Sequence, residues 1–318
     1  MNRALPHLLR IAGLGLILIG LVAAFYGPLE IYVFYLLSPG GRFHYEGFGM
    51  GSLWFAALVA QNIGYYAIAA LFIPLGIGHL KLRRWVLTLT RLCAWFWLGA
   101  GVLVIGNAVA LMPSALRLAL GQRISLARLA IAGAVALVLL VALPVLMLRL
   151  YGSERVKLVL EKHDTNSYWT DRYAFPLLAL LLLFAIMIIV MHLTIFFQGL
   201  FPAFGQILLG RQSARVVSLC ILLLGILIYG PVQLKTWAWW GSLVYVSLLT
   251  VSTVWSFSKY GLYDILLMLN PPAYETEFLD KLTLMHDLHP VGVLAPPLFV
   301  ALALIVCSRR CFREAGPW

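Results

Sequence analysis

The sequence predicts an all-α integral membrane protein with about eight transmembrane helices, and three observations support this. Hydrophobic residues make up 63% of the chain and charged residues 11%, with a mean hydropathy of +0.95, whereas a soluble domain carries about 25% charged residues. Apolar runs of about 20 residues recur, which is the length that a helix needs to cross a bilayer. These runs are continuous rather than alternating, so helices are favoured over a β-barrel.

Eight apolar runs qualify as membrane spans. The first also resembles a signal peptide, because Arg3 and Arg10 flank an apolar stretch that contains Val22-Ala23-Ala24, but its length favours an uncleaved helix. Pro296 and Pro297 predict a kink in the last span. The expected spans are 10–27, 51–79, 86–112, 127–149, 175–198, 215–233, 236–257 and 291–308.

The distribution of Lys and Arg predicts that both termini are cytoplasmic. Most of the 23 basic residues fall in the N-terminus, the even-numbered loops and the C-terminus, and cytoplasmic loops are enriched in such residues. This bias accounts for the net charge of +11 and predicts contact with anionic lipid headgroups, with no role in nucleic-acid binding. We therefore expect a multi-pass protein of the bacterial cytoplasmic (inner) membrane, whose four cysteines form no disulfide framework.

A repeated motif divides the chain into two halves. Leu80-Lys81 followed by Trp85 recurs as Leu234-Lys235 followed by Trp239, with the same spacing. We predict a four-helix module at 1–150, a polar cytoplasmic linker at 151–173 and a second four-helix module at 174–318. Because each half has an even number of spans, the two copies run parallel, unlike the inverted repeats of many transporters.

The repeated motif has a physical explanation at a membrane surface. A Lys side chain reaches the headgroups while a Trp ring lies at the boundary between water and hydrocarbon. We therefore expect Lys81, Trp85, Lys235 and Trp239 to act as interfacial anchors of two helical hairpins.

Three loops on the predicted outer side are unusually apolar. The stretch from Leu29 to Leu37 is apolar and aromatic, and residues 199–214 have the composition of an interfacial or re-entrant segment. The stretch from Glu275 to Leu288 is amphipathic, as in a helix that lies in the interface plane. We expect these segments to cover the outer side of the protein.

Histidines provide the candidates for metal or cofactor binding. His286 and His289, with Asp287 between them, have a spacing that allows two ligands on one helical turn. No third ligand stands nearby in sequence, so a solvated helix end is the favoured alternative. His192, near the outer end of the fifth span, is a candidate axial ligand for haem or a pigment, but it has no counterpart in the first half.

Polar residues inside the spans are candidates for a transport pathway. Hydrogen bonding between helices explains the same residues without a substrate, and it is the favoured explanation. They are Gln61, Asn62, Asn107, Thr250 and Thr253.

Motifs of known catalytic chemistry are absent from the sequence. There is no Walker A loop, no Gly-x-Ser-x-Gly, no His-Glu-x-x-His and no intramembrane Asp pair. The linker residues Glu161, His163, Asp164 and Asp171 are interspersed with Lys and Arg, as in a solvated loop. The sequence therefore leans against an enzyme and predicts no cofactor.

The stretch from Gly230 to Trp240 resembles a broad group of uncharacterised bacterial polytopic membrane proteins, in which a glycine-containing helix end leads to Leu-Lys/Arg-x-x-Trp-Ala. The stretches from Tyr168 to Arg172 and from Phe175 to Leu177 also resemble that group. The first half departs from the pattern, since Val86 follows Trp85 where the group has Ala. The resemblance implies a multi-helix module and no catalytic residues.

These observations lead to three hypotheses of function. The leading one is a non-enzymatic subunit or scaffold of a bacterial cytoplasmic-membrane complex, with other membrane proteins as partners. The second is a transporter or lipid-handling protein with a path between its two halves. The third, which the sequence favours least, is a redox subunit that binds a cofactor through His192 or the pair His286 and His289.

Overall fold

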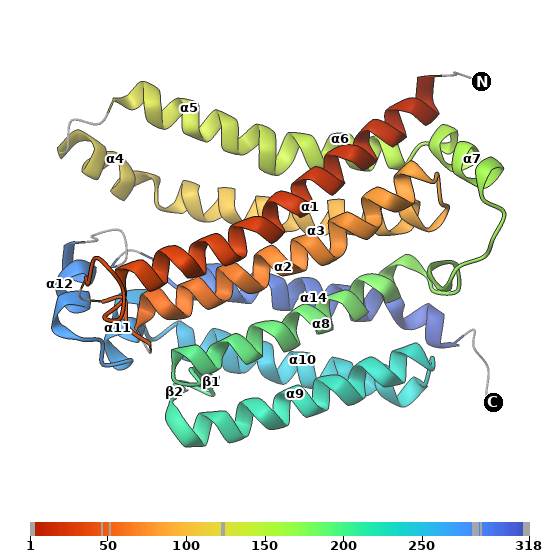
Figure 1. The fold of residues 1–318 in the computed structure, drawn as a ribbon. Coiled ribbons are helices and arrows are strands. Elements are labelled where there is room, and N and C mark those ends of the chain that lie inside the picture. The colour runs from red at the N-terminus through yellow and green to blue at the C-terminus, as the bar shows by residue number, and fades with distance from the viewer. Residues whose placement is uncertain are drawn as a thin grey trace. The chain divides into compact units, whose positions relative to one another are not determined.

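The computed structural model describes residues 4–45, 47–50, 52–121, 125–281, 286 and 288–313. It confirms an all-α protein, because eight helical stretches within these residues are long and apolar enough to cross a membrane (Figure 1). The eight candidate spans are Leu5–Leu37, Leu53–Leu80, Trp85–Ala110, Leu126–Tyr151, Phe175–Phe197, Gly210–Val232, Thr236–Phe257 and Val291–Phe312.

Two compact units make up the chain. The first comprises Met1–Ile105 with Leu126–Tyr173, and the second comprises Gly106–Ser125 with Ala174–Trp318. The polar segment 151–173 thus groups with the first unit. The module boundaries at 150 and 174 stay a prediction.

The first unit contains a tightly packed pair of long helices, α1 (Ala4–Leu37) and α2 (Leu53–Leu80), which run antiparallel (Figure 1). A Cβ atom on Gly13 would lie 2.7 Å from the carbonyl oxygen of Gly76, and a Cβ on Gly76 would lie 2.5 Å from that of Gly13. Only glycine allows two backbones to approach so closely, a packing mode common between membrane helices. This contact fixes the register of the pair.

Helix α1 corrects the predicted first span and outer loop. The hydropathy pattern predicts a span that ends at residue 27 and a separate apolar segment from Leu29 to Leu37, but α1 continues through Pro28 to Leu37. Proline removes one backbone donor, and a long helix packed against a neighbour tolerates that loss.

The fourth span is interrupted by a π-helical turn. It consists of α5 (Leu126–Leu137), the π-helix η1 (Val138–Ala142) and α6 (Leu143–Tyr151), with Pro144 in the first turn of α6. Such a turn accommodates the proline without ending the span. After it follow the short helix α7 (Glu154–His163) and the 3₁₀ turn η2 (Trp169–Asp171).

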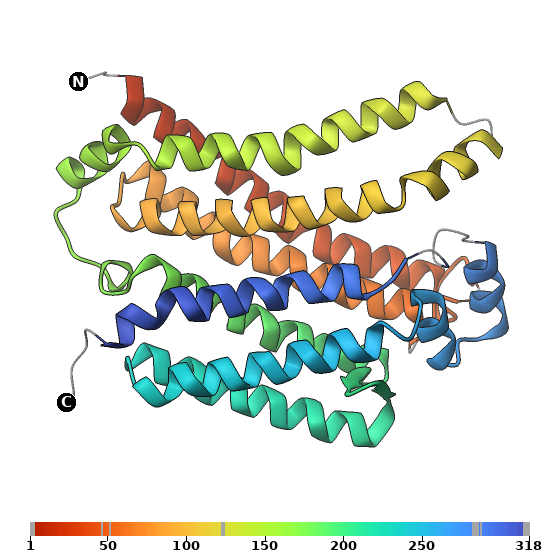
Figure 2. The ribbon, with the colours of Figure 1, turned by 180° about the vertical axis from the view of Figure 1, so that it is seen from behind.

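The second unit is a group of membrane helices with short elements between them. Figure 2 shows α14 (Val291–Arg313) lying along α10 (Thr236–Phe257), which also contacts α9 (Gly210–Val232). The other elements are α4 (Met112–Gly121), α8 (Phe175–Leu193), η3 (Thr194–Phe197), α11 (Leu262–Met268) and α12 (Ala273–Lys281).

A small β-hairpin forms in the segment that the sequence suggested as re-entrant. Strands β1 (Phe201–Ala203) and β2 (Gln206–Leu208) pair antiparallel, with Phe201 opposite Leu208. Two hydroxyls of α10 hold the turn, since Ser252 Oγ accepts from Phe204 N at 3.0 Å and Ser256 Oγ accepts from Gly205 N at 2.9 Å. Residues 199–214 thus form two things: a β-hairpin that packs on α10, and the first residues of α9. Their apolar composition reflects both.

Two tight connections, between α2 and α3 (Trp85–Ala110) and between α9 and α10, have the same construction. The N–H of Arg83 donates to the carbonyl of Gly78 at 2.8 Å, and that of Lys235 donates to the carbonyl of Gly230 at 3.0 Å. The preceding residues, Leu82 and Leu234, are left-handed with φ of 49° and 53°. Both connections are Schellman motifs, a common helix end that usually has glycine in the left-handed position.

This geometry corrects the register of the predicted repeat. The spacing in the sequence pairs Leu80 with Leu234 and Trp85 with Trp239. When the two connections are aligned by their left-handed residues, Leu82 corresponds to Leu234. In the same alignment, Trp85 corresponds to Trp237. The shared local pattern is therefore Gly-x-x-x-Leu-Arg/Lys-x-Trp, beginning at Gly78 and Gly230.

Candidate functional site

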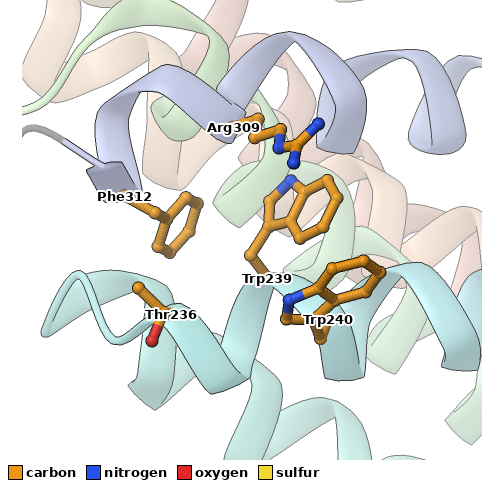
Figure 3. A pocket seen from close by; sticks show the side chains of 5 residues that line it. All are labelled: Thr236, Trp239, Trp240, Arg309 and Phe312. Atoms are coloured by element: carbon orange, nitrogen blue, oxygen red, sulfur yellow. The ribbon is translucent and has the colours of Figure 1, made fainter.

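A basic, aromatic pocket lies where the start of α10 meets the end of α14 (Figure 3). Its volume is about 210 Å³, and it is lined by Thr236, Trp239, Trp240, Arg309 and Phe312. A second cavity, of about 510 Å³, is lined by Val306, Cys307, Arg309 and Arg310. Arg309 lines both cavities, so its guanidinium group is the central charge of this region.

Trp239 contacts both helices of the pocket. Its indole N–H donates to the carbonyl of Ile305 on α14 at 2.7 Å, and its side chain is almost entirely buried. The guanidinium carbon of Arg309 lies 5.2 Å from the centre of the Trp239 ring, as in a cation–π contact (Figure 3). The ring of Trp240 meets that of Trp239 edge-on at 4.7 Å. A fixed indole therefore positions the arginine.

The charge of the pocket is uncompensated in the part of the chain that the structure describes. Neither Arg309 nor Arg310 forms an ion pair with any described carboxylate, although ion pairs involve other residues of the protein. Among the residues that the structure describes, no acidic side chain lines either cavity. The arrangement suits an anion.

A cluster of three polar side chains, Glu30, Asn62 and Tyr65, lies between α1 and α2. The Tyr65 hydroxyl donates to Glu30 Oε1 at 2.7 Å. The other carboxylate oxygen, Oε2, and the side-chain oxygen of Asn62 are both buried and receive no hydrogen bond from the described residues. Gly27 makes room for the amide, since a Cβ there would lie 3.0 Å from Asn62 Oδ1. Two buried acceptors without donors are costly in a helix pair unless a further group binds them.

Sequence reasoning missed Glu30 because it ended the first span at residue 27. Continuing the apolar pattern of Leu29 to Leu37 as helix would have placed this carboxylate inside a membrane span. Ionisable groups in such positions are functional candidates.

The polar segment after α6 is attached to the α2–α3 connection through Asp164. Its carboxylate accepts from the Tyr168 hydroxyl at 2.7 Å and from the Arg84 backbone N–H at 3.1 Å, and it lies 3.5 Å from an Arg83 nitrogen. Arg84 in turn lies 3.7 Å from Glu161. Asp164 is only 3% exposed, so the expectation that these acidic residues belong to a solvated loop is wrong for Asp164.

These contacts set the protonation of Asp164. Burial raises the pKa of its carboxyl group, but the hydrogen bonds from Tyr168, Arg84 and Asn166 and the charge of Arg83 outweigh burial and hold the pKa below its ordinary value. The ionised carboxylate of Asp164 therefore joins the polar segment after α6 to the α2–α3 connection.

The predicted metal and cofactor residues lie apart from these sites. The His286 ring stacks on Tyr263 with 3.9 Å between ring centres, His289 is exposed, and Asp287 lies outside the described residues. His192 is exposed and donates from Nδ1 to the Ile188 carbonyl at 2.8 Å. Among the described residues, no group of three or more His, Cys, Asp or Glu side chains forms a potential metal site.

The residues of the predicted polar pathway are dispersed. Gln61 is exposed, and Asn107 Nδ2 donates to the Gly292 carbonyl at 3.4 Å. The Thr250 hydroxyl donates to the Val246 carbonyl at 2.7 Å, and Thr253 is buried. Neither of the two cavities at the α10–α14 end is lined by these residues. The pathway stays a prediction.

The predicted interfacial anchors differ in exposure. Lys81 and Lys235 are exposed and Trp85 is partly buried, whereas Trp239 is buried and its indole is bonded within the protein. Trp237 and Trp240, beside it, are exposed. Sequence spacing alone did not distinguish the structural tryptophan from its exposed neighbours.

No family model matches the chain, and comparisons with curated proteins and with solved structures return no match.

Proposed function

We propose that the protein is a non-enzymatic integral subunit or scaffold of a complex in the bacterial cytoplasmic membrane. The observation that carries the proposal is the exposure of the fourth span. Neither α5 nor η1 contains a buried residue. Only 6% of the most apolar part of this span is buried, against 44% for the span formed by α10.

The composition of α5 fits a contact with another membrane helix. Half of its 12 residues are Ala or Gly, and a Cβ on Gly133 would meet nothing within 4 Å. Lipid tails are as apolar as Leu side chains, so membrane helices associate through close packing, and small residues at the interface permit it. A membrane subunit with a small-residue helix is the partner that this surface fits.

Crosslinking in native membranes tests this proposal. A photoreactive amino acid at Gly133 is expected to capture one membrane protein in constant proportion, and the same group at Gly225 is not. Gly225 is the matched control because it also lies on a membrane helix with open space around it. Gly133→Leu should abolish co-purification of the captured protein in mild detergent, and Gly225→Leu should preserve it. Crosslinks to lipid alone, and migration as a monomer without a stoichiometric partner, would contradict the proposal.

Ion-coupled transport is the second candidate, and the Glu30 group favours it. The carboxylate lies in a candidate membrane span and has one oxygen without a donor among the described residues. Carboxylates in such positions serve as proton relays in transporters. Proteoliposomes under an imposed potential should then show a proton flux that Glu30→Gln removes and Glu154→Gln, at an exposed carboxylate of α7, preserves. A flux equal to that of protein-free liposomes would rule out proton-coupled transport by this group.

A further inference from the structure

We propose that the pocket at the α10–α14 end binds the phosphate headgroup of an anionic phospholipid, with Arg309 as the principal contact. The inference is independent of the proposed subunit role, because it rests on other residues in another part of the chain. Arg309 lines both cavities of this region, and Arg310 adds a second guanidinium to one of them.

The arginine is available for an external anion. Guanidinium groups bind phosphate through several parallel hydrogen bonds, and a guanidinium that already faced a carboxylate would be occupied. Arg309 has no such partner among the described residues and packs on the ring of Trp239 instead. Because the Trp239 indole is fixed by its bond to Ile305, the cation is held in place before a ligand arrives.

The rest of the lining favours a lipid over a soluble anion. Three aromatic side chains, Trp239, Trp240 and Phe312, line the smaller cavity beside Arg309 (Figure 3). Aromatic rings of this kind lie at the level of lipid headgroups, and basic pockets between membrane helices bind anionic headgroups. The volume of about 210 Å³ is below the range of about 300 Å³ and more that encloses a whole drug-sized ligand. A headgroup whose chains stay in the membrane fits such a pocket.

Native mass spectrometry of the full chain, released from nanodiscs of phosphatidylcholine with a minor share of phosphatidylglycerol, tests the site. The wild-type protein is expected to retain phosphatidylglycerol over phosphatidylcholine. Arg309→Gln should weaken the retention about five-fold, the effect of one basic residue near an anionic surface. Arg309→Lys, which keeps the charge and loses the planar group, should fall between the two.

Arg211→Gln is the matched control, because it removes the same charge from the opposite end of α9, away from the connection to α10. Equal lipid retention in the wild type, Arg309→Gln and Arg211→Gln would overturn the proposal. Displacement of phosphatidylglycerol by inorganic phosphate at equal concentration would also overturn it, since the site would then recognise a free anion. Thermal unfolding of each variant shows that a loss of binding is not a loss of folding.

Discussion

The α2–α3 and α9–α10 connections share a backbone and differ in what holds them to the rest of the protein. In both, a glycine carbonyl accepts a hydrogen bond from the backbone N–H of a basic residue, and that basic residue directly follows a left-handed leucine. The first connection is tied by charge, through Asp164 to the segment after α6. The second is tied through Trp239 to the backbone of α14, beside an arginine without a carboxylate partner in the described chain. Arg83 and Arg84 of the first connection thus have carboxylate partners, whereas Arg309 beside the second connection has none among the described residues.

The largest expected effect comes from the glycine common to both connections. A Cβ on Gly230 would lie 2.2 Å from Ala238 Cβ, which cannot move without the backbone, so Gly230→Ala should cost about 3 kcal/mol of unfolding free energy. On Gly78 it would lie 2.4 Å from Val86 Cγ1 and 2.6 Å from Trp85 Cζ2, and these side-chain atoms, unlike a Cβ, can move without the backbone, so Gly78→Ala should cost about 1–2 kcal/mol. Unfolding in mixed detergent micelles measures both.

Each glycine has a control on its own helix. Gly225 in α9 and Gly64 in α2 have open space at the Cβ position, and substitution by Ala there should change stability by less than about 1 kcal/mol. Equal costs at all four positions would show that the close helix approach does not matter.

The next largest effect is expected at Asp164, whose carboxylate joins the polar segment after α6 to the α2–α3 connection. Asp164→Asn leaves the donors around it facing a neutral amide, and it should cost about 1–3 kcal/mol and speed tryptic cleavage within α7. Glu154→Gln should cost less than about 0.5 kcal/mol, because its pair with Lys157 is exposed. Unchanged cleavage in Asp164→Asn would mean that the linker is held by apolar packing alone.

A smaller effect is expected at Trp239, whose indole hydrogen bond joins α10 to α14 in the second unit. Trp239→Phe keeps a ring but loses the bond to the Ile305 carbonyl, at a cost of about 1 kcal/mol. Trp240→Phe, at an exposed ring, should be close to neutral in stability. If the two variants unfold alike, the indole bond does not fix α10 against α14.

The smallest effect is a pH dependence confined to the first unit. The pKa of Asp164 is lower in the folded protein than its ordinary value of 3.8, so its stabilisation is complete above that value and is lost as the pH falls below it. Proteolytic protection of α7 with an acid-active protease should therefore decline below about pH 4. Asp164→Asn should remove this decline, and a decline of equal size in the variant would assign it to other groups.

The sequence predicted the spans well and the tertiary sites poorly, for physical reasons. Spans follow from the length and hydropathy of single segments, which the chain displays directly. The first span was predicted at 10–27, because the length and hydropathy of a single run do not reveal that packing against α2 carries α1 through Pro28 to Leu37. The burial of Asp164 arises from partners far away in sequence. Leucine in a left-handed position carries no signal of its own, so the repeat was matched in the wrong register around Leu82.

We predict that the two connections are equivalent points of two parallel halves, and labelling tests this prediction most directly. Lys81 and Gln233 occupy equivalent exposed positions, one residue before each left-handed leucine. In a protein whose four native cysteines are replaced by Ala, Lys81→Cys and Gln233→Cys should both react with a membrane-impermeant maleimide in inside-out vesicles and not in intact cells. Labelling of the two cysteines from opposite sides of the membrane would contradict parallel halves.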